Sequence, residues 1–336
     1  TLATDAVTAA KIPASLENTF VSGRKNMVIN GAMNVAQRGT SFTGLGASDL
    51  FTLDRYKFDF GGTDGRLTAE QSTDAPNGFS HSLKLSCTTA DTSVAASSKA
   101  RVFYGFEGQD LKGIGKGTSD AKAITASFYV KGNAAATYVC EFYDIDNDRQ
   151  CSKLFDVTTA WTRVELTFPA DTTGAFTYDN TTGGRLSFWF MAGSERSGGT
   201  LNSSAFANSV TANRAAGCDN FFDSTSRILQ ITGVQLELGS TATDFEHRSF
   251  GEELALCQRY FEKSYDYATL AGTNTVNSAV GRHGTAGTAT SGEMFTSTVF
   301  KVEKRAAPTV LAYSTSGNAG KCTVTNFGVT EHFNEV

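Results

Sequence analysis

Three alternating aspartates have the spacing that comes nearest to that of a metal site. Asp144, Asp146 and Asp148 lie in the run DIDNDRQC, which begins like an oxygen-rich calcium loop. Such a loop has glycine at its sixth position and glutamate at its twelfth, whereas this chain has Arg149 and Phe155 there. Aspartate and asparagine also favour tight turns. We interpret the run as an acidic hairpin tip without a metal, with weak divalent-ion binding by the three carboxylates as the alternative.

Aromatic side chains on expected strands offer a second kind of chemistry, the binding of sugars. The face of an aromatic ring matches the apolar C–H face of a pyranose, while nearby amides and carboxylates bind the hydroxyls. We take Trp189, Tyr104 and Tyr143 as the candidate glycan platform, with Trp189 first because it opposes Phe188 and Phe190 along its strand. Core packing is the competing interpretation for each ring, since half the side chains of a strand point inward.

Catalytic chemistry finds little support in the sequence. The chain has 4 histidines, His81, His247, His283 and His332. None of them belongs to an HExxH motif of metalloproteases, and the sequence has no comparable motif such as the GxSxG of serine hydrolases. Spacing singles out no pair of carboxylates of the kind that cleaves glycans. We therefore expect no enzymatic activity and no cofactor.

The 6 cysteines show neither a CxxC pair nor the spacing of zinc ligands. Cys140 and Cys151 could face each other across a hairpin whose turn lies near Asp146 and Asn147, so a disulfide is geometrically possible. The alternative is their ordinary use as small buried apolar residues. Scattered cysteines in a chain without a signal sequence indicate synthesis in a reducing cytoplasm.

Composition excludes several classes of protein. The chain has 336 residues, with 29 basic and 34 acidic side chains and a formal net charge of −5. Hydrophobic residues make up 40% and charged residues 19%, below the roughly one quarter usual for globular proteins, so a disordered chain is excluded. The sequence has no run of lysines and arginines and no stretch near the roughly 20 apolar residues of a membrane helix. We expect neither a nucleic-acid partner nor membrane insertion.

Short strands joined by glycine and asparagine turns are the expected elements, because the chain has 33 glycines but only 4 prolines. The run RLSFWFM carries apolar groups on both faces, which predicts a central strand or one that lines a groove. In RILQITGVQLELG the apolar phase switches at Gly233, which indicates a β-bulge. Runs of this kind predict a β-sandwich with strands at 83–86, 101–105, 124–130, 137–143, 163–168, 185–191 and 227–238.

The same reasoning divides the chain into four regions. Small polar residues over 1–22 predict a stalk or linker, and the sandwich follows over 23–250. A helix is expected over 251–265. Residues 266–336 return to a β pattern, with a strand over 294–302, and we expect them to pack on the sandwich or on a neighbouring subunit.

The helix expected over 251–265 has both a start signal and a periodic apolar pattern. Ser249 and Glu252 have the spacing of a capping box, and the apolar residues recur at intervals of three and four, namely Leu254, Cys257, Phe261 and Tyr265. Such a helix either covers one edge of a sheet or meets equivalent helices around an oligomer axis through an aromatic stripe formed by Tyr260, Phe261 and Tyr265.

Three segments taken together carry a resemblance to a known class of protein. They are KNMVINGAMNVAQRGTSF with DLFTLDRYKF within 25–58, ITGVQLELGSTATDFEHRSFGEELALCQRYFEKSY at 231–265, and FKVEKRAAPTV at 300–310. They resemble tail-fibre and related virion appendage proteins of tailed bacteriophages, notably those of marine and cyanobacterial phages. The likeness spans nearly the whole chain, and ATDAVTAAKIPA at 3–14 looks like the shaft repeat that leads into such heads.

Residues 26–250 also look like the jelly-roll carbohydrate-binding modules of glycan-active proteins. The likeness rests on Trp161 in AWTRVELTF and on the late strand ITGVQLELG with its threonine-rich exit. Those modules often have an acidic pair in the late strand, where this chain has Gly233 and Gln235, so no structural calcium site is carried over to that strand.

Together these resemblances imply a jelly-roll-like β-sandwich that forms the receptor-binding head of a phage tail fibre. The implied protein is a homotrimer of the virion, assembled in the host cytoplasm with other phage tail or virion proteins. Its implied ligand is a polysaccharide or lipopolysaccharide of the host cell surface. A capsid- or tail-anchored fibre or decoration protein with an assembly role is the alternative, and a tailspike polysaccharide depolymerase is the less favoured one.

Overall fold

The computed structural model describes residues 24–276, 299–326 and 329–333. The chain divides into two compact units, one formed by residues up to Ala36 and from Thr40 to Phe250, the other by Gln37–Gly39 and Gly251–Val336. The stalk expected over 1–22 lies outside the described residues, as do residues 294–298 of the expected strand over 294–302. The rest of that stretch, residues 299–302, forms no strand.

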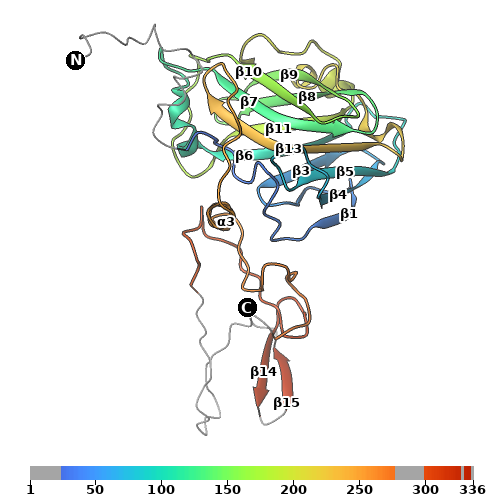
Figure 1. Ribbon diagram of the computed structural model, residues 1–336, viewed down its shortest axis with the longest axis vertical. Coiled ribbons are helices and arrows are strands. Elements are labelled where there is room, and N and C mark those ends of the chain that lie inside the picture. Colours follow the sequence, from blue (N-terminus) through green and yellow to red (C-terminus); the bar gives the residue numbers. More distant parts are fainter. Residues whose placement is uncertain (1–23, 277–298, 327–328, 334–336) are drawn as a thin grey trace, which may run out of the picture. The chain divides into compact units, whose positions relative to one another are not determined.

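The first unit is a sandwich of two antiparallel sheets, which lie face to face in Figure 1. One sheet has six strands in the order β1 (Ser41–Leu45), β4 (Arg66–Ser72), β5 (Ser82–Thr89), β13 (Ile228–Leu238), β7 (Ile124–Gly132) and β10 (Thr162–Phe168). The other has seven, in the order β12 (Ala207–Asn208), β9 (Arg149–Val157), β8 (Ala136–Asp144), β11 (Thr182–Ala192), β6 (Lys99–Glu107), β3 (Tyr56–Gly61) and β2 (Leu50–Phe51). The predicted jelly-roll-like, mainly β fold is confirmed.

Short helical turns connect the strands of the sandwich. They are η2 (Gly108–Ile114), α2 (Ser194–Ser197), η3 (Thr211–Asn213) and η4 (Phe221–Asp223). None of the helices among the described residues has the length and hydropathy to span a bilayer.

Phenylalanines from both sheets form the core between them. The ring of Phe188 on β11 meets Phe128 on β7 edge-to-face at 5.0 Å between centroids, and Phe128 meets Phe155 on β9 at 5.1 Å. Burying one such ring contributes about 1.5–3 kcal/mol, and edge-to-face contacts add about 0.5–1.5 kcal/mol. Strand β11 lies in the middle of its sheet, with core rings on one face and Trp189 on the other, as its two-sided apolar pattern predicts.

The bulge predicted at Gly233 is confirmed. The pairing of β13 with β7 shifts between Thr232 and Gln235, and Gly233 has a φ of +63°. A side chain there would be strained, and its Cβ would lie 2.7 Å from the ring of Phe79. The bulge therefore lets the apolar residues on both sides of it point into the core, namely Leu229, Ile231, Val234 and Leu236.

The outer face of the six-stranded sheet is covered near the end of β13 by the chain that follows this strand. Gln235 is fully buried there, and its amide donates to the carbonyls of Thr243 and Asp244 at 3.4 and 3.3 Å. Glu237, which is 1% exposed, accepts hydrogen bonds from the backbone N–H and the hydroxyl of Thr243 at 2.8 and 2.7 Å. This polar face therefore uses its donors and acceptors internally.

A chain segment also runs along the free edge of β9 in the seven-stranded sheet. The backbone N–H of Ser152 donates to the carbonyl of Asn202 at 2.8 Å, and the Asn202 amide donates to the carbonyl of Gln150 at 2.7 Å. Farther along, Ala207 and Asn208 pair with β9 as the short strand β12. The first part of the β9 edge, from Arg149 to Ser152, is thereby paired.

The second unit contains α3 (Phe250–Gln258) and a hairpin of β14 (Cys322–Asn326) with β15 (Val329–Phe333). The helix predicted over 251–265 is corrected at its end, because α3 stops at Gln258. The last carbonyl of α3, that of Gln258, accepts a hydrogen bond from Lys304 Nζ at 2.6 Å in place of the next helical N–H group. Beyond the helix, Gln37 Nε2 donates to Phe261 O at 2.9 Å. The predicted aromatic stripe therefore does not lie on one helix, since Tyr260, Phe261 and Tyr265 follow α3.

Candidate functional site

The outer face of the seven-stranded sheet gathers polar and aromatic side chains from neighbouring strands. Because Phe188 and its alternate neighbours on β11 face the core, Arg185, Ser187 and Trp189 point the other way. The antiparallel registers place residues of β6, β8 and β9 beside them. This outer face is formed by Phe51, Lys57, Arg101, Phe103, Gly105, Val139, Glu141, Tyr143, Ser152, Arg185, Ser187 and Trp189.

Glu141 is the centre of a buried ionic network on this face. Its carboxylate is fully buried and accepts hydrogen bonds from Arg214 Nε and Nη2 at 2.7 and 2.9 Å and from Trp189 Nε1 at 2.9 Å. Arg101 lies 3.4 Å away and also binds Asp59 at 2.8 Å. A buried carboxylate needs such charge-assisted donors, and this one has them.

Two groups of the network have pKa values shifted toward their charged forms. Burial alone would raise the pKa of Asp59, but the charges and hydrogen bonds of Arg101 and Lys99 outweigh it and lower the pKa. Burial opposes the charge of Arg214, yet Glu141 raises the pKa of that guanidinium above its ordinary value. The Asp59 carboxylate and the Arg214 guanidinium are therefore charged at neutral pH.

The expected platform at Trp189 is covered by the loop that follows β11. The indole is 1% exposed and packs with Val139 and Ala215, and Leu201 and Cys218 lie against the same cluster. The ring thus has no face open to a ligand, which corrects the expectation of an exposed platform. Its N–H is used within the protein, by Glu141.

Tyr104 and Tyr143 lie on opposite faces of the seven-stranded sheet. Tyr104 is 1% exposed on the inner face, where its hydroxyl accepts a hydrogen bond from the backbone N–H of Ile29 at 3.1 Å, so the expectation that it meets a ligand is also corrected. Tyr143 is half-buried on the outer face beside Trp189, and the Arg214 guanidinium lies 4.2 Å from its ring centre and 5.4 Å from that of Trp189. The structure therefore brings together two of the three expected aromatic residues.

Arg185 stands out on the outer face because no carboxylate of the described residues pairs with it. Its Cζ lies 4.9 Å from the ring centre of Phe103, and its enclosed Nε has no hydrogen-bond partner among the described residues. Burial and the neighbouring charge of Arg101 lower its pKa. The hydroxyls of Ser187 and Ser152, on either side of Glu141 in the register, are likewise buried without a partner in the described part of the chain.

Reasoning from the sequence missed these arginines and Glu141. Arg185 could have been found, because it lies at even spacing from Trp189 in RLSFWFM and must share its face. Arg214 gave no such signal, since it comes from a loop whose position depends on tertiary packing.

The acidic run is the tip of the hairpin formed by β8 and β9, as predicted. Asp144 is fully buried and lies 2.5 Å from Lys116 Nζ, Asp146 accepts the backbone N–H of Thr177 at 2.8 Å, and Asp148 accepts the Tyr143 hydroxyl. The three carboxylates have different partners. Within the described residues, no group of three or more His, Cys, Asp or Glu side chains is arranged to hold a metal ion.

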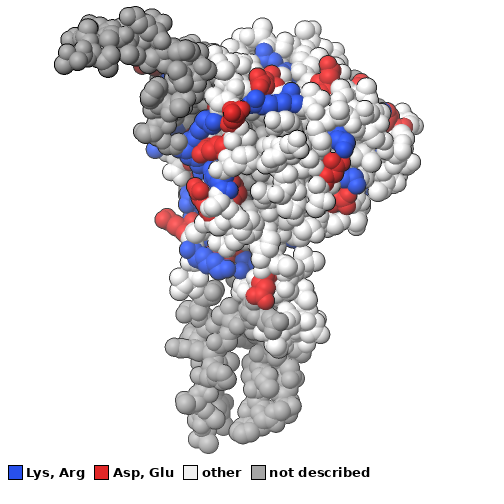
Figure 2. Space-filling view, viewed as in Figure 1, with Lys and Arg blue, Asp and Glu red and all other residues white. Residues whose placement is uncertain are grey.

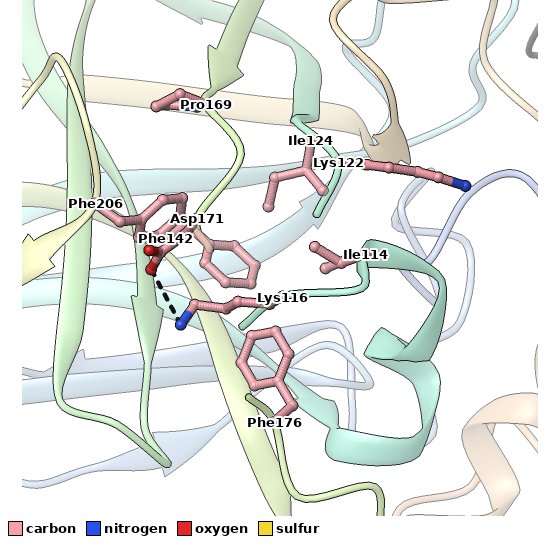
Figure 3. A pocket seen from close by; sticks show the side chains of 9 residues that line it. All are labelled: Ile114, Lys116, Lys122, Ile124, Phe142, Pro169, Asp171, Phe176 and Phe206. Atoms are coloured by element: carbon pink, nitrogen blue, oxygen red, sulfur yellow. Dashed lines mark ion pairs between the residues drawn. The ribbon is translucent and has the colours of Figure 1, made fainter. Parts of the chain in front are cut away.

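The partner of Asp144 belongs to a second buried ionic cluster, beside a small apolar pocket (Figure 3). Lys116 Nζ lies 2.5 Å from Asp144 Oδ2 and 3.1 Å from Asp171 Oδ2, and it donates to the carbonyls of Thr173 and Gly174 at 2.7 Å each. Burial would raise the pKa of Asp171, but hydrogen bonds from Arg149 and Lys116 lower it. This ammonium group occupies a cage of four oxygens and holds the loop after β10 against the hairpin tip.

Cys140 and Cys151 are free thiols on neighbouring strands. Cys140 pairs with Lys153, and Cys151 with Phe142, so the two cysteines are not opposite each other. Burial raises the pKa of Cys140 and raises that of Cys151 to about 11. The second interpretation from the sequence, small buried apolar residues, describes them.

No protein-family model matches the chain, and no curated protein matches it. Solved structures do match its fold. The enzymatically active domain of tailspike protein 4 from bacteriophage CBA120 is 14% identical over 63% of this chain and 21% of that chain, with a TM-score of 0.35. A family 11 carbohydrate-binding module from Clostridium thermocellum, in complex with a mixed-linked tetrasaccharide, is 11% identical over 61% of this chain and 99% of its own, with a TM-score of 0.30. An arabinose-bound α-L-arabinofuranosidase is 14% identical over 64% and 26%, with a TM-score of 0.34.

Proposed function

We propose that this protein is a carbohydrate-binding head and that its ligand lies on the outer face of the seven-stranded sheet. One observation carries the proposal: Arg185 lies half-buried on this face without a carboxylate partner among the residues that the structure describes, beside the aromatic rings of Phe103 and Tyr143. On the outer face of the six-stranded sheet, by contrast, the polar side chains of Gln235 and Glu237 bind the chain's own Thr243 and Asp244.

The dimensions of this face suit an extended oligosaccharide. The residues of this face that remain at least partly exposed include Tyr143, Arg185, Gly105, Lys57 and Phe51, which lie on the neighbouring strands β8, β11, β6, β3 and β2. At about 4.8 Å between strands they extend over about 19 Å. Phe51, at its end, is 42% exposed, and sugar rings stack on such apolar surfaces while their hydroxyls bind polar neighbours.

Binding without cleavage is the activity we propose. A glycan-cleaving pair of carboxylates needs one group free to donate a proton and another free to attack or to activate water. The two carboxylates of the network, Glu141 and Asp59, are already bound to arginines of the protein itself. They stabilise the face on which a sugar would lie.

The finer role we propose is attachment of a phage tail fibre, as a homotrimer, to host surface polysaccharide or lipopolysaccharide. Several weak sites on one particle give useful avidity. For the second unit we propose a role in assembly, because it exposes much apolar surface. Among the described residues, seven of the thirteen large apolar side chains that are exposed belong to this unit, namely Tyr267, Leu270, Val276, Val299, Phe300, Val310 and Leu311. Such surface is typical of contacts between subunits.

The charge distribution supports a glycan rather than a nucleic acid as ligand. The chain has 29 basic and 34 acidic side chains and a formal net charge of −5, and on the one face of the molecule that Figure 2 shows the two signs are intermixed. A partner recognised through its phosphates would require a field of one sign.

The test is binding of the purified chain to a panel of bacterial lipopolysaccharides and capsular polysaccharides by calorimetry. Phe51→Ala and Tyr143→Ala should each weaken binding about fivefold, the effect of about 1 kcal/mol of stacking. Tyr129→Ala, on the other sheet, is the matched control and should bind like the unaltered protein. Binding to virion proteins alone would favour the assembly role, and release of reducing ends would favour a depolymerase. Binding that survives both outer-face substitutions refutes the placement of the site.

A further inference from the structure

We infer that Arg185 binds the carboxylate of an acidic sugar, so that the polysaccharide bound by this protein contains uronic or similar sugar acids. This inference rests on the proposed function and names the class of ligand for the same face.

The other cations near Arg185 in the described part of this face are all paired with carboxylates. Arg101 lies against Asp59 and Glu141, and Arg214 binds Glu141 through two nitrogens. The two lysines nearby are also paired, Lys99 with Asp59 and Lys57 with Asp49. Among the described residues of this face, Arg185 is the cation that remains without a carboxylate.

The surroundings of Arg185 leave room for a ligand on one side. Its partner across to β6 is Gly105, where an added Cβ would meet only the side chain of Thr182, at 3.1 Å from its methyl group. On the other side the register places Tyr143 of β8. The guanidinium therefore lies between an aromatic residue and a position that has no side chain.

Stacking on Phe103 leaves the donor edges of the guanidinium free. With Cζ at 4.9 Å from the ring centre, Phe103 holds the group from its face, and face contacts use none of its N–H bonds. A planar carboxylate matches the fork of an arginine through two parallel hydrogen bonds. A neutral hydroxyl would use only part of that fork.

The neighbouring charges favour an anion further. Burial lowers the pKa of Arg185 most, and the like charges of Arg101 and Arg214 lower it further, while the charge of Asp59 partly offsets them. A bound carboxylate would relieve this repulsion, whereas a neutral sugar would leave it. The same reasoning applies to a sulfate ester, which the experiment has to distinguish.

The experiment compares uronic-acid-containing capsular polysaccharides with their carboxyl-reduced, neutral forms, and adds a sulfated polymer beside its unsulfated parent. The full chain should bind at least one acidic polymer about tenfold more tightly than its reduced form. Arg185→Gln should remove this preference while the affinity for the reduced form stays unchanged. Arg163→Gln, the same change of charge on the other sheet, should keep the preference.

Each result decides between the two proposals. Equal binding of the native and reduced forms overturns the acidic-sugar inference and leaves carbohydrate binding intact. The same conclusion follows if Arg185→Gln weakens binding of both forms equally while the near-UV CD spectrum of the protein is unaltered. Preference for the sulfated polymer alone overturns the carboxylate assignment. Binding of none of the polymers overturns the proposed function itself.

Discussion

Replacing Lys116 with methionine should destabilise the sandwich strongly, because it leaves buried carboxylates without their cation. Asp144 is fully buried and Asp171 is 7% exposed. Asp171 would keep its two hydrogen bonds to Arg149, at 2.8 and 2.9 Å, but Asp144 would keep only those from Asn147. Breaking a buried ion pair by removing one partner costs about 3–5 kcal/mol, and the solitary position of Asp144 places the expected loss within that range.

Urea unfolding followed by tryptophan fluorescence measures this loss in the sandwich alone, since both tryptophans, Trp161 and Trp189, belong to the first unit. Lys122→Met is the control: Lys122 lines the same pocket, is exposed and extends away from the carboxylates in Figure 3. Adding Asp144→Asn to Lys116→Met should recover part of the loss, because no buried charge would then stand alone. A Lys116→Met protein within about 1 kcal/mol of the unaltered chain, or a double variant less stable than the single one, would refute this reasoning.

Three further predictions concern the same unit. Because ion pairing lowers the pKa of Asp59 and Asp171 in the folded protein, their contribution to stability should be complete above about pH 4 and lost as the pH falls further, which acid unfolding followed by fluorescence would measure. Glu141→Gln should cost about 3–5 kcal/mol in urea unfolding, since it leaves two arginines facing each other, and an unchanged midpoint would contradict the network described above. Gly233→Ala should lose about 1–2 kcal/mol from its left-handed backbone, more if Phe79 cannot move, and a gain in thermal midpoint would disprove the bulge.

The strands were predictable because their pattern is local. The expected strand over 185–191 is β11 (Thr182–Ala192), and the switch of apolar phase at Gly233 coincides with the bulge in β13. The end of α3 was not predictable, because the group that satisfies its last carbonyl, Lys304, comes from a distant part of the chain. The periodicity of residues 251–265 contains no information about a hydrogen-bond donor so distant in the sequence.

The site was only partly predictable for the same reason. Alternation places Trp189 and Tyr143 on outward positions, but it cannot show that the loop carrying Ala215 covers the indole. The isolation of Arg185 depends on how arginines of β6 and of that loop share two carboxylates across four strands. The role proposed for Arg185 depends on its lacking a carboxylate partner, and no local sequence motif reveals that.

The segment that pairs with β9 has a consequence for how copies of this protein meet. An open strand edge is a template on which another chain can add a strand, and long exposed edges promote aggregation. Here one edge of the seven-stranded sheet is occupied by Asn202 and by β12, and the other ends in β2, which has two residues. Strand addition by a neighbouring copy is therefore disfavoured at these two places of the seven-stranded sheet, where little backbone is left for a neighbour to extend.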